Sequence, residues 1–212
     1  MRAKRRRRNS NNKRNVLLII IICIVVTTIF TINHELRIKL RDIAVYKCEN
    51  RATDMINEAI QNTLDNSDYT YNDLVEINKN SDNEITSVSC VSSKINSLKT
   101  DISRQINKGF ENQDKNGFNI AVGTISGINL FSGVGPEIKV HFEKEGSVKT
   151  NIKSSFSSAG INQTLHRIYV EISTDIVAIA ASGTYKSNVK TEFLLAETII
   201  VGEIPEGYVS IS

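Results

Sequence analysis

Three histidines are the residues of this 212-residue chain best suited to metal or acid–base chemistry. His34 follows an apolar run, whereas His141 and His166 lie in segments whose apolar residues alternate as in strands. Neither His-x-x-x-His nor His-Glu-x-x-His occurs, the spacings that place two imidazoles on one helix face for zinc. We therefore predict two histidines on a sheet surface, with no metal and no cofactor. Convergence of His141, His166 and an acid in one cleft would instead favour a hydrolase.

Cys48 and Cys90 are the cysteines outside the apolar run, which itself contains Cys23. Two such thiols could form a disulfide if their domain lies outside the cytoplasm. Free, partly buried thiols explain the sequence equally well, so the pairing stays open. A zinc ribbon and a thioredoxin-like centre are excluded because no Cys-x-x-Cys occurs.

Serine and carboxylate side chains lack the settings that catalysis requires. The chain has no Gly-x-Ser-x-Gly, and no Ser-x-x-Lys lies beside the partner motifs of serine acyl-enzymes. The acid pairs Glu143/Glu145 and Glu203/Glu206 each adjoin a glycine, which predicts solvated acids at turns rather than an acid–base pair. We therefore predict no catalytic residue, and a protein that is not an enzyme.

The segment Gly123–Pro136, GTISGINLFSGVGP, is rich in glycine and carries no charge. It is not a phosphate-binding loop, because no Gly-Lys-Ser/Thr follows and the dinucleotide Gly-x-Gly-x-x-Gly spacing is missing. Its apolar members are Ile125, Ile128, Leu130, Phe131 and Val134. Such a loop could enter a membrane, line an apolar pocket, meet a protein partner or fold back over the sheet.

The net charge of +3 conceals a separation along the chain. Residues 1–15 carry eight of the 26 basic residues and no acid, which leaves 18 basic against 23 acidic residues in 16–212. The protein is therefore not a uniformly basic nucleic-acid binder, and we predict no nucleic-acid partner.

An uncharged apolar run, VLLIIIICIVVTTIFTI, follows the basic segment directly. As a helix it would span about 25 Å, close to the ~30 Å hydrocarbon core of a bilayer. The exit from the run lacks an Ala-x-Ala-like cleavage pattern, so we predict an uncleaved transmembrane helix over 16–33. The positive-inside rule then predicts that residues 1–15 form a cytoplasmic tail and that residues 34–212 form an extracytoplasmic domain.

The remaining pattern predicts a helix, a hairpin, a second helix and three strands. These elements are an amphipathic continuation of the membrane helix over 36–64, strands near 74–77 and 85–91, a helix from Ser92 or Ser93 to Gly109, and strands near 148–156, 166–180 and 191–201. A turn at Gly160–Asn162 separates the first two of the later strands. We predict an α+β fold with a largely antiparallel β-sheet in the C-terminal half, and 34–212 as one domain.

Three C-terminal stretches resemble the sporulation protein YunB family of endospore-forming Firmicutes. They are GTISGINLFSGVGPEIKV (123–140), FSSAGINQTLHRIYVEI (156–172) and LLAETIIVGEIPEGYVSI (194–211). The layout of a basic tail, one membrane helix and an extracytoplasmic domain is also similar to that family. The resemblance implies a role in making the spore, and it implies no reaction and no catalytic residue.

These observations predict a single-pass, signal-anchored membrane protein that spore formation requires, acting as a structural or interaction module at the forespore envelope. The expected partners are the membrane and an unidentified spore-envelope protein. A cell-envelope hydrolase with a dispersed site and a lipid-binding module are the alternatives. The residues expected to make contacts are Gly123, Gly127, Phe131, Gly133, Gly135, Pro136, Gly160, Asn162, Gln163, Thr164, His166 and Arg167.

Overall fold

The computed structural model describes residues 8–67, 69–81, 84–111, 117–160 and 162–202. The first seven residues of the basic tail and the acid pair Glu203/Glu206 lie outside the described residues. The chain divides into two compact units, residues 1–44 with 119–138 and residues 45–118 with 139–212.

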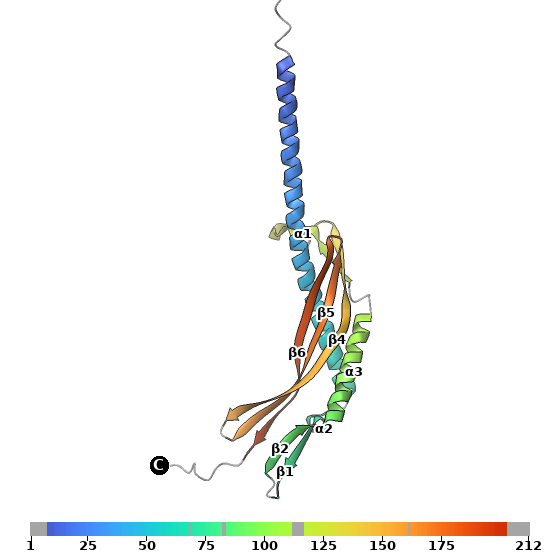
Figure 1. The fold of residues 1–212 in the computed structure, drawn as a ribbon, viewed down its shortest axis with the longest axis vertical. Helices are drawn as coiled ribbons and strands as arrows, with labels where there is room; N and C mark the ends of the chain where they lie inside the picture. Colours follow the sequence, from blue (N-terminus) through green and yellow to red (C-terminus); the bar gives the residue numbers. More distant parts are fainter. Residues whose placement is uncertain (1–7, 68, 82–83, 112–116, 161, 203–212) are drawn as a thin grey trace, which may run out of the picture. The chain divides into compact units, whose positions relative to one another are not determined.

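The first element is a single 59-residue helix, α1, spanning Arg8–Asn66 (Figure 1). It contains neither Pro nor Gly, so nothing in the backbone interrupts it, and the predicted continuation of the apolar run into an amphipathic helix is confirmed. Its apolar run is exposed throughout, and this stretch is long and apolar enough to cross a membrane. Further along, one face of α1 is buried at roughly every fourth residue: Leu40, Ala44, Cys48, Ala52, Ile56, Ile60 and Thr63.

A short helix and a hairpin follow α1. The helix α2 (Tyr71–Leu74) begins with a capping box in which the Thr70 amide donates to Asp73 Oδ2 at 2.8 Å. Strand β1 (Val75–Lys79) pairs antiparallel with β2 (Ile85–Cys90), and the Val91 amide donates to the Leu74 carbonyl at 2.9 Å. The predicted hairpin is therefore confirmed.

The second long helix, α3, spans Ser92–Glu111 and confirms the prediction made from apolar spacing. It runs through Gly109 to Glu111, slightly beyond the predicted end. Its buried side chains recur at four-residue steps, so one stripe faces the core. They are Leu98, Ile102, Ile106 and Phe110.

The C-terminal half forms a four-stranded sheet in the order β3-β4-β5-β6. The strands are β3 (Gly117–Ala121), β4 (Glu137–Gly160), β5 (Gln163–Ala180) and β6 (Gly183–Val201). Both β4–β5 and β5–β6 are antiparallel, which confirms the α+β class with an antiparallel C-terminal sheet. The β4–β5 turn uses Gly160 and Asn162 at positive φ, as predicted.

Two boundaries differ from the sequence prediction. Gly146 was expected at a turn beside Glu143 and Glu145, but β4 continues through it, and the register shifts between Glu145 and Lys149. Positive φ at Gly146 therefore produces a bulge within a long strand. The last strand begins at Gly183 rather than near residue 191, because β6 pairs with β5 over its whole length.

Within the second unit, α3 and the C-terminal part of α1 cover the same face of the sheet (Figure 1). The Ser103 hydroxyl of α3 bonds Thr150 on β4 at 2.8 Å, and the Glu49 carboxylate of α1 accepts from Ser187 on β6. Alternation along β5 sends Ile168, Val170, Ile172, Thr174 and Ile176 inward, where all five are buried. The outward face carries charges, so it faces solvent.

Candidate functional site

A buried histidine joins three elements of the second unit. His166 on β5 is 1% exposed, since it alternates in phase with Ile168 and Val170. Its Nδ1 lies 2.7 Å from the Tyr71 hydroxyl of α2, and its Nε2 lies 2.8 Å from Ser154 Oγ of β4. The prediction that His166 lies on the sheet surface is therefore wrong; the β5 alternation, read from its apolar members, already placed it inward.

The electrostatics of this cluster favour a neutral imidazole. Burial lowers the pKa of His166, because the protonated ring would lose solvation there. Burial also raises the pKa of Tyr71, with a smaller contribution from Cys90. The Phe156 ring stacks on His166 with centroids 4.2 Å apart and planes 7° apart. A neutral imidazole that is hydrogen-bonded on both sides links α2, β4 and β5 without burying a charge.

The Ser154–His166 pair has one feature of a nucleophile activated by a base, since the serine residue is exposed and its oxygen reaches the imidazole. The hydroxyl of Tyr71 is the third group in this series of hydrogen bonds. Acyl-transfer enzymes place a carboxylate at the corresponding position, where it stabilises the imidazolium. The arrangement is therefore better suited to joining elements than to accepting a proton.

The other histidine of the sheet, His141 on β4, lies far from His166. His141 pairs with Ile179 of β5. Ile179 and His166 are an odd number of residues apart on this strand, so their side chains point to opposite faces of the sheet. Thirteen strand positions separate Ile179 from His166, about 40 Å along the strand. The convergence of His141, His166 and an acid in one cleft, which would have favoured a hydrolase, is therefore not found for these two histidines. Among the described residues, no group of three His, Cys, Asp or Glu side chains could hold a metal ion.

The Gly-rich segment of the first unit forms a closely bonded loop containing α4 (Val122–Ser126) and the 3-10 turn η2 (Asn129–Phe131). The Gly123 amide donates to the Val134 carbonyl at 2.9 Å. A Cβ on Gly123 would lie 1.9 Å from the Phe131 carbonyl oxygen, so this close backbone approach requires glycine. The Gly133 amide donates to Thr124 Oγ1 at 3.0 Å.

This loop leaves apolar side chains in contact with solvent. Leu130 is 83% exposed and Phe131 is 48% exposed, and Ile128 and Val134 are also exposed. Ile125 is buried and anchors the loop from within. Of the four alternatives left open for this loop, folding back to cover its apolar side chains does not hold for these four residues. The Lys39 ammonium of α1 donates to the Ser126 carbonyl at 3.3 Å and so ties the loop to the helix.

The other residues expected to make contacts lie at the β4–β5 turn. Gln163 and Thr164 are exposed at the start of β5, and Arg167 forms an ion pair with Glu197 of β6 at 2.6 Å. The Asn162 carbonyl accepts from the Gly202 amide at 2.8 Å. Within this turn the structure brings Gly160, Asn162, Gln163 and Thr164 together, and it turns His166 away from solvent into the core.

The two cysteines of the second unit are free thiols in the structure. Cys48 is fully buried on α1, and burial, followed by the charge of Glu49, raises its pKa to about 12. A thiol with such a pKa is a poor nucleophile. Cys90 lies exposed at the end of β2.

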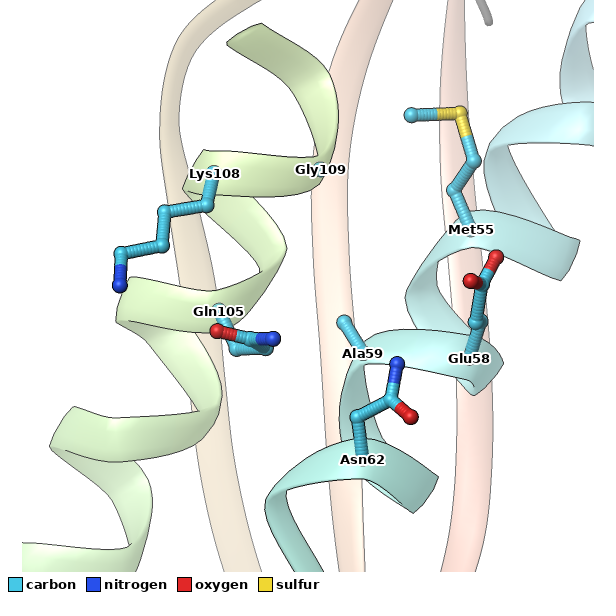
Figure 2. A pocket seen from close by; sticks show the side chains of 7 residues that line it. All are labelled: Met55, Glu58, Ala59, Asn62, Gln105, Lys108 and Gly109. Atoms are coloured by element: carbon cyan, nitrogen blue, oxygen red, sulfur yellow. The ribbon is translucent and has the colours of Figure 1, made fainter. Parts of the chain in front are cut away.

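A groove between α1 and α3 was not foreseen from the sequence (Figure 2). Figure 2 shows Met55 of α1 and Gly109 of α3 on its opposite walls, where the absence of a side chain at Gly109 leaves space. Glu58, Gln105 and Lys108 give it a mixed polar lining, which does not suit a lipid chain. Helix periodicity predicted the buried stripes on both helices, but it does not predict a groove between them.

The geometry defines an α+β domain that continues, through one unbroken helix, into a segment able to cross a membrane. Comparison with known proteins confirms the resemblance seen in the sequence: residues 117–207 match the family described as Sporulation protein YunB (Spo_YunB). The chain is also 24% identical over 193 residues to Sporulation protein YunB of Bacillus subtilis (strain 168), covering 85% of this chain and 75% of that protein. No solved structure matches the chain significantly.

Proposed function

We propose that this protein is a membrane-anchored module required for spore formation, which acts through contacts rather than through a reaction. The similarity to Sporulation protein YunB over most of both chains supports a role in sporulation. The proposed place is the membrane surrounding the forespore, with the basic tail in the cytoplasm and the α+β domain outside it. The proposed partners are the bilayer and a protein of the spore envelope, without nucleic acid.

The observation that carries this proposal is the change in exposure along α1. Phe30 is 73% exposed and belongs to a stretch in which every large apolar side chain faces outward. In contrast, Ala52 and Ile56, on the same helix, are fully buried against the domain. Because water does not favour such a length of exposed apolar helix, a bilayer is its natural surroundings.

The charge step supports the proposed orientation. Eight basic residues precede the apolar run, whereas Arg37, Lys39 and Arg41 follow it together with Glu35 and Asp42. The larger excess of Lys and Arg favours the cytoplasmic side. An uncleaved anchor with this orientation carries the whole folded domain across the membrane.

The native thiols provide a test of the topology. Cys90 is exposed, whereas Cys48 is buried and Cys23 lies in the apolar run. In intact protoplasts that express the chain, a membrane-impermeant maleimide should label the protein, and Cys90→Ser should abolish the labelling. Labelling only after lysis would contradict the proposed orientation.

The role in sporulation needs a test in the cell. A fluorescent fusion of the full chain should collect at the membranes around the forespore, and deletion of the gene should lower the yield of heat-resistant spores. A fusion that stays in the cytoplasm, together with normal sporulation of the deletion strain, would contradict the proposal.

A second candidate function, hydrolysis through an acyl-enzyme, is favoured by the 2.8 Å contact between Ser154 Oγ and His166 Nε2. The decisive variant is Ser154→Ala, with Ser155→Ala on the opposite face of β4 as its control. Loss of spore formation with Ser154→Ala alone, at normal protein level, would favour the hydrolase. Normal sporulation by both variants supports the contact module.

A further inference from the structure

The first unit presents two apolar surfaces with no cover among the described residues. One is the apolar run of α1, and the other is the loop 127–134 with Ile128, Leu130, Phe131 and Val134. A surface that exposes four large apolar side chains within eight residues usually meets another apolar phase. Their presence in one unit suggests that a single apolar phase covers both.

The loop is joined to α1 just beyond the end of the apolar run. Lys39 donates to the Ser126 carbonyl, and its ammonium lies 3.2 Å from where a Cβ on Gly127 would be. Figure 1 shows this loop, in yellow-green, beside the helix. Lys39 follows Ile32 by seven residues, about 10 Å along the helix axis. The polar interfacial layer of a bilayer extends roughly 5–8 Å beyond its hydrocarbon core, so the loop is anchored at the edge of that layer.

The composition of the loop fits the same surroundings. Residues 117–136 contain no Asp, Glu, Lys or Arg, so insertion would bury no charge. The backbone groups of the loop are largely satisfied internally, since Gly123, Gly127, Gly133 and Val134 all donate within it. Two basic residues of α1 that follow the apolar run, Arg37 and Lys39, suit the phosphates of lipid headgroups.

We infer that loop 127–134 inserts Leu130 and Phe131 into the outer interfacial layer of the same bilayer that α1 spans. The anchor then has two points of contact, so the first unit is held in a defined orientation at the membrane rather than rotating about a single helix. This inference rests on the proposed membrane anchoring, and it adds a specific lipid-contacting surface to it.

The chain contains no Trp, so a single introduced Trp reports on one position. Three variants of the full chain are compared in vesicles of phosphatidylcholine and phosphatidylglycerol: Leu130→Trp in the loop, Phe30→Trp in the apolar run and Tyr46→Trp on α1. Tyr46 is 63% exposed and lies seven residues beyond Lys39, so it is a matched exposed position farther from the bilayer. Circular dichroism and a second loop variant, Phe131→Trp, guard against local misfolding.

The expected result is a blue-shifted Leu130→Trp emission that is strongly quenched by lipids brominated near the carbonyl end of the acyl chain. Phe30→Trp should also be quenched by brominated lipid, whereas Tyr46→Trp should respond only to aqueous acrylamide. If Phe30→Trp is quenched and both loop variants respond to acrylamide alone, the loop inference is overturned and the anchor stands. Loop variants shielded from both quenchers would overturn it in favour of a protein cover. An unquenched Phe30→Trp would overturn the anchor and the loop inference together.

Discussion

Two regions of this protein reverse the usual distribution of polar and apolar groups, and they do so in opposite directions. The His166 cluster buries an imidazole between the hydroxyl groups of Tyr71 and Ser154, whereas the loop 127–134 exposes apolar side chains. Both nitrogens of the buried imidazole find hydrogen-bond partners within the domain, so the cluster is complete in itself. The exposed apolar groups have no cover among the residues that the structure describes, which favours a contact with something outside the chain.

The largest expected effect comes from removing the imidazole. His166→Ala leaves Tyr71 and Ser154 without their shared partner and a cavity beneath Phe156, so the free energy of unfolding should fall by about 3 kcal/mol. Urea unfolding in detergent, followed by circular dichroism, measures this change. His141→Ala is the control and should change little, because His141 is only half-buried. Equal effects of the two substitutions would show that the cluster does not support the fold.

A second change tests whether the loop is a built structure. Gly123→Ala places a methyl group against the Phe131 and Val134 carbonyl oxygens, so the backbone must shift at a cost of about 2 kcal/mol. Proteolysis within 123–136 should accelerate. Gly109→Ala is a matched control, because the nearest atom to its new Cβ is Met55 Cε at 3.9 Å, an ordinary contact. Unchanged proteolysis of Gly123→Ala would mean that the loop does not need this close approach.

The pH dependence of stability tests the neutral state of the cluster. Because burial lowers the folded-state pKa of His166, the unfolded chain binds the proton more readily as pH falls below about 6.5. This group's contribution to stability is fully present above that pH and is lost as pH falls toward the folded-state pKa. Urea midpoints at about pH 7.5 and about pH 5 should therefore differ less for His166→Gln than for the unchanged chain. A wider difference in the variant would mean that the imidazole is charged when folded.

The smallest effect on stability is expected at the exposed tip of the loop. Leu130→Ser removes an 83% exposed side chain and should change the free energy of unfolding by less than about 0.5 kcal/mol. The buried neighbour Ile125→Ser is the contrast and should cost about 3 kcal/mol. Thermal unfolding of both variants in detergent measures the two changes in stability. A large cost for Leu130→Ser would place this side chain in the core and remove the reason for an external contact.

Much of the fold could be predicted because the patterns were long and regular. Spacing at three and four residues along α1 and α3, and at two residues along β5, marked which face of each element is buried. The structural role of a single glycine was harder to predict, since this residue type forms a turn at Gly160 and a bulge at Gly146. The difference depends on whether the neighbouring strand continues to pair, which is not a local property.

The candidate sites divide in the same way. The apolar composition of the Gly-rich loop was visible in the sequence, but the exposure of its side chains depends on how the loop closes around Gly123 and Ile125. The His166 cluster joins residues 95 positions apart in the chain, from Tyr71 to His166. Hydrogen bonds of that separation leave no periodic signal, so sequence spacing could not reveal them.

The sequence by itself determined the apolar helix, its flanking charge step, the α+β order and the likeness to sporulation proteins, because each depends on residues near one another or on extended pattern. The tertiary structure alone decided that the His166 imidazole bonds Tyr71 and Ser154, that Cys48 and Cys90 are free, and that Leu130 and Phe131 face outward. These features depend on which distant segments come together, since burial and long-range hydrogen bonds belong to the folded chain as a whole.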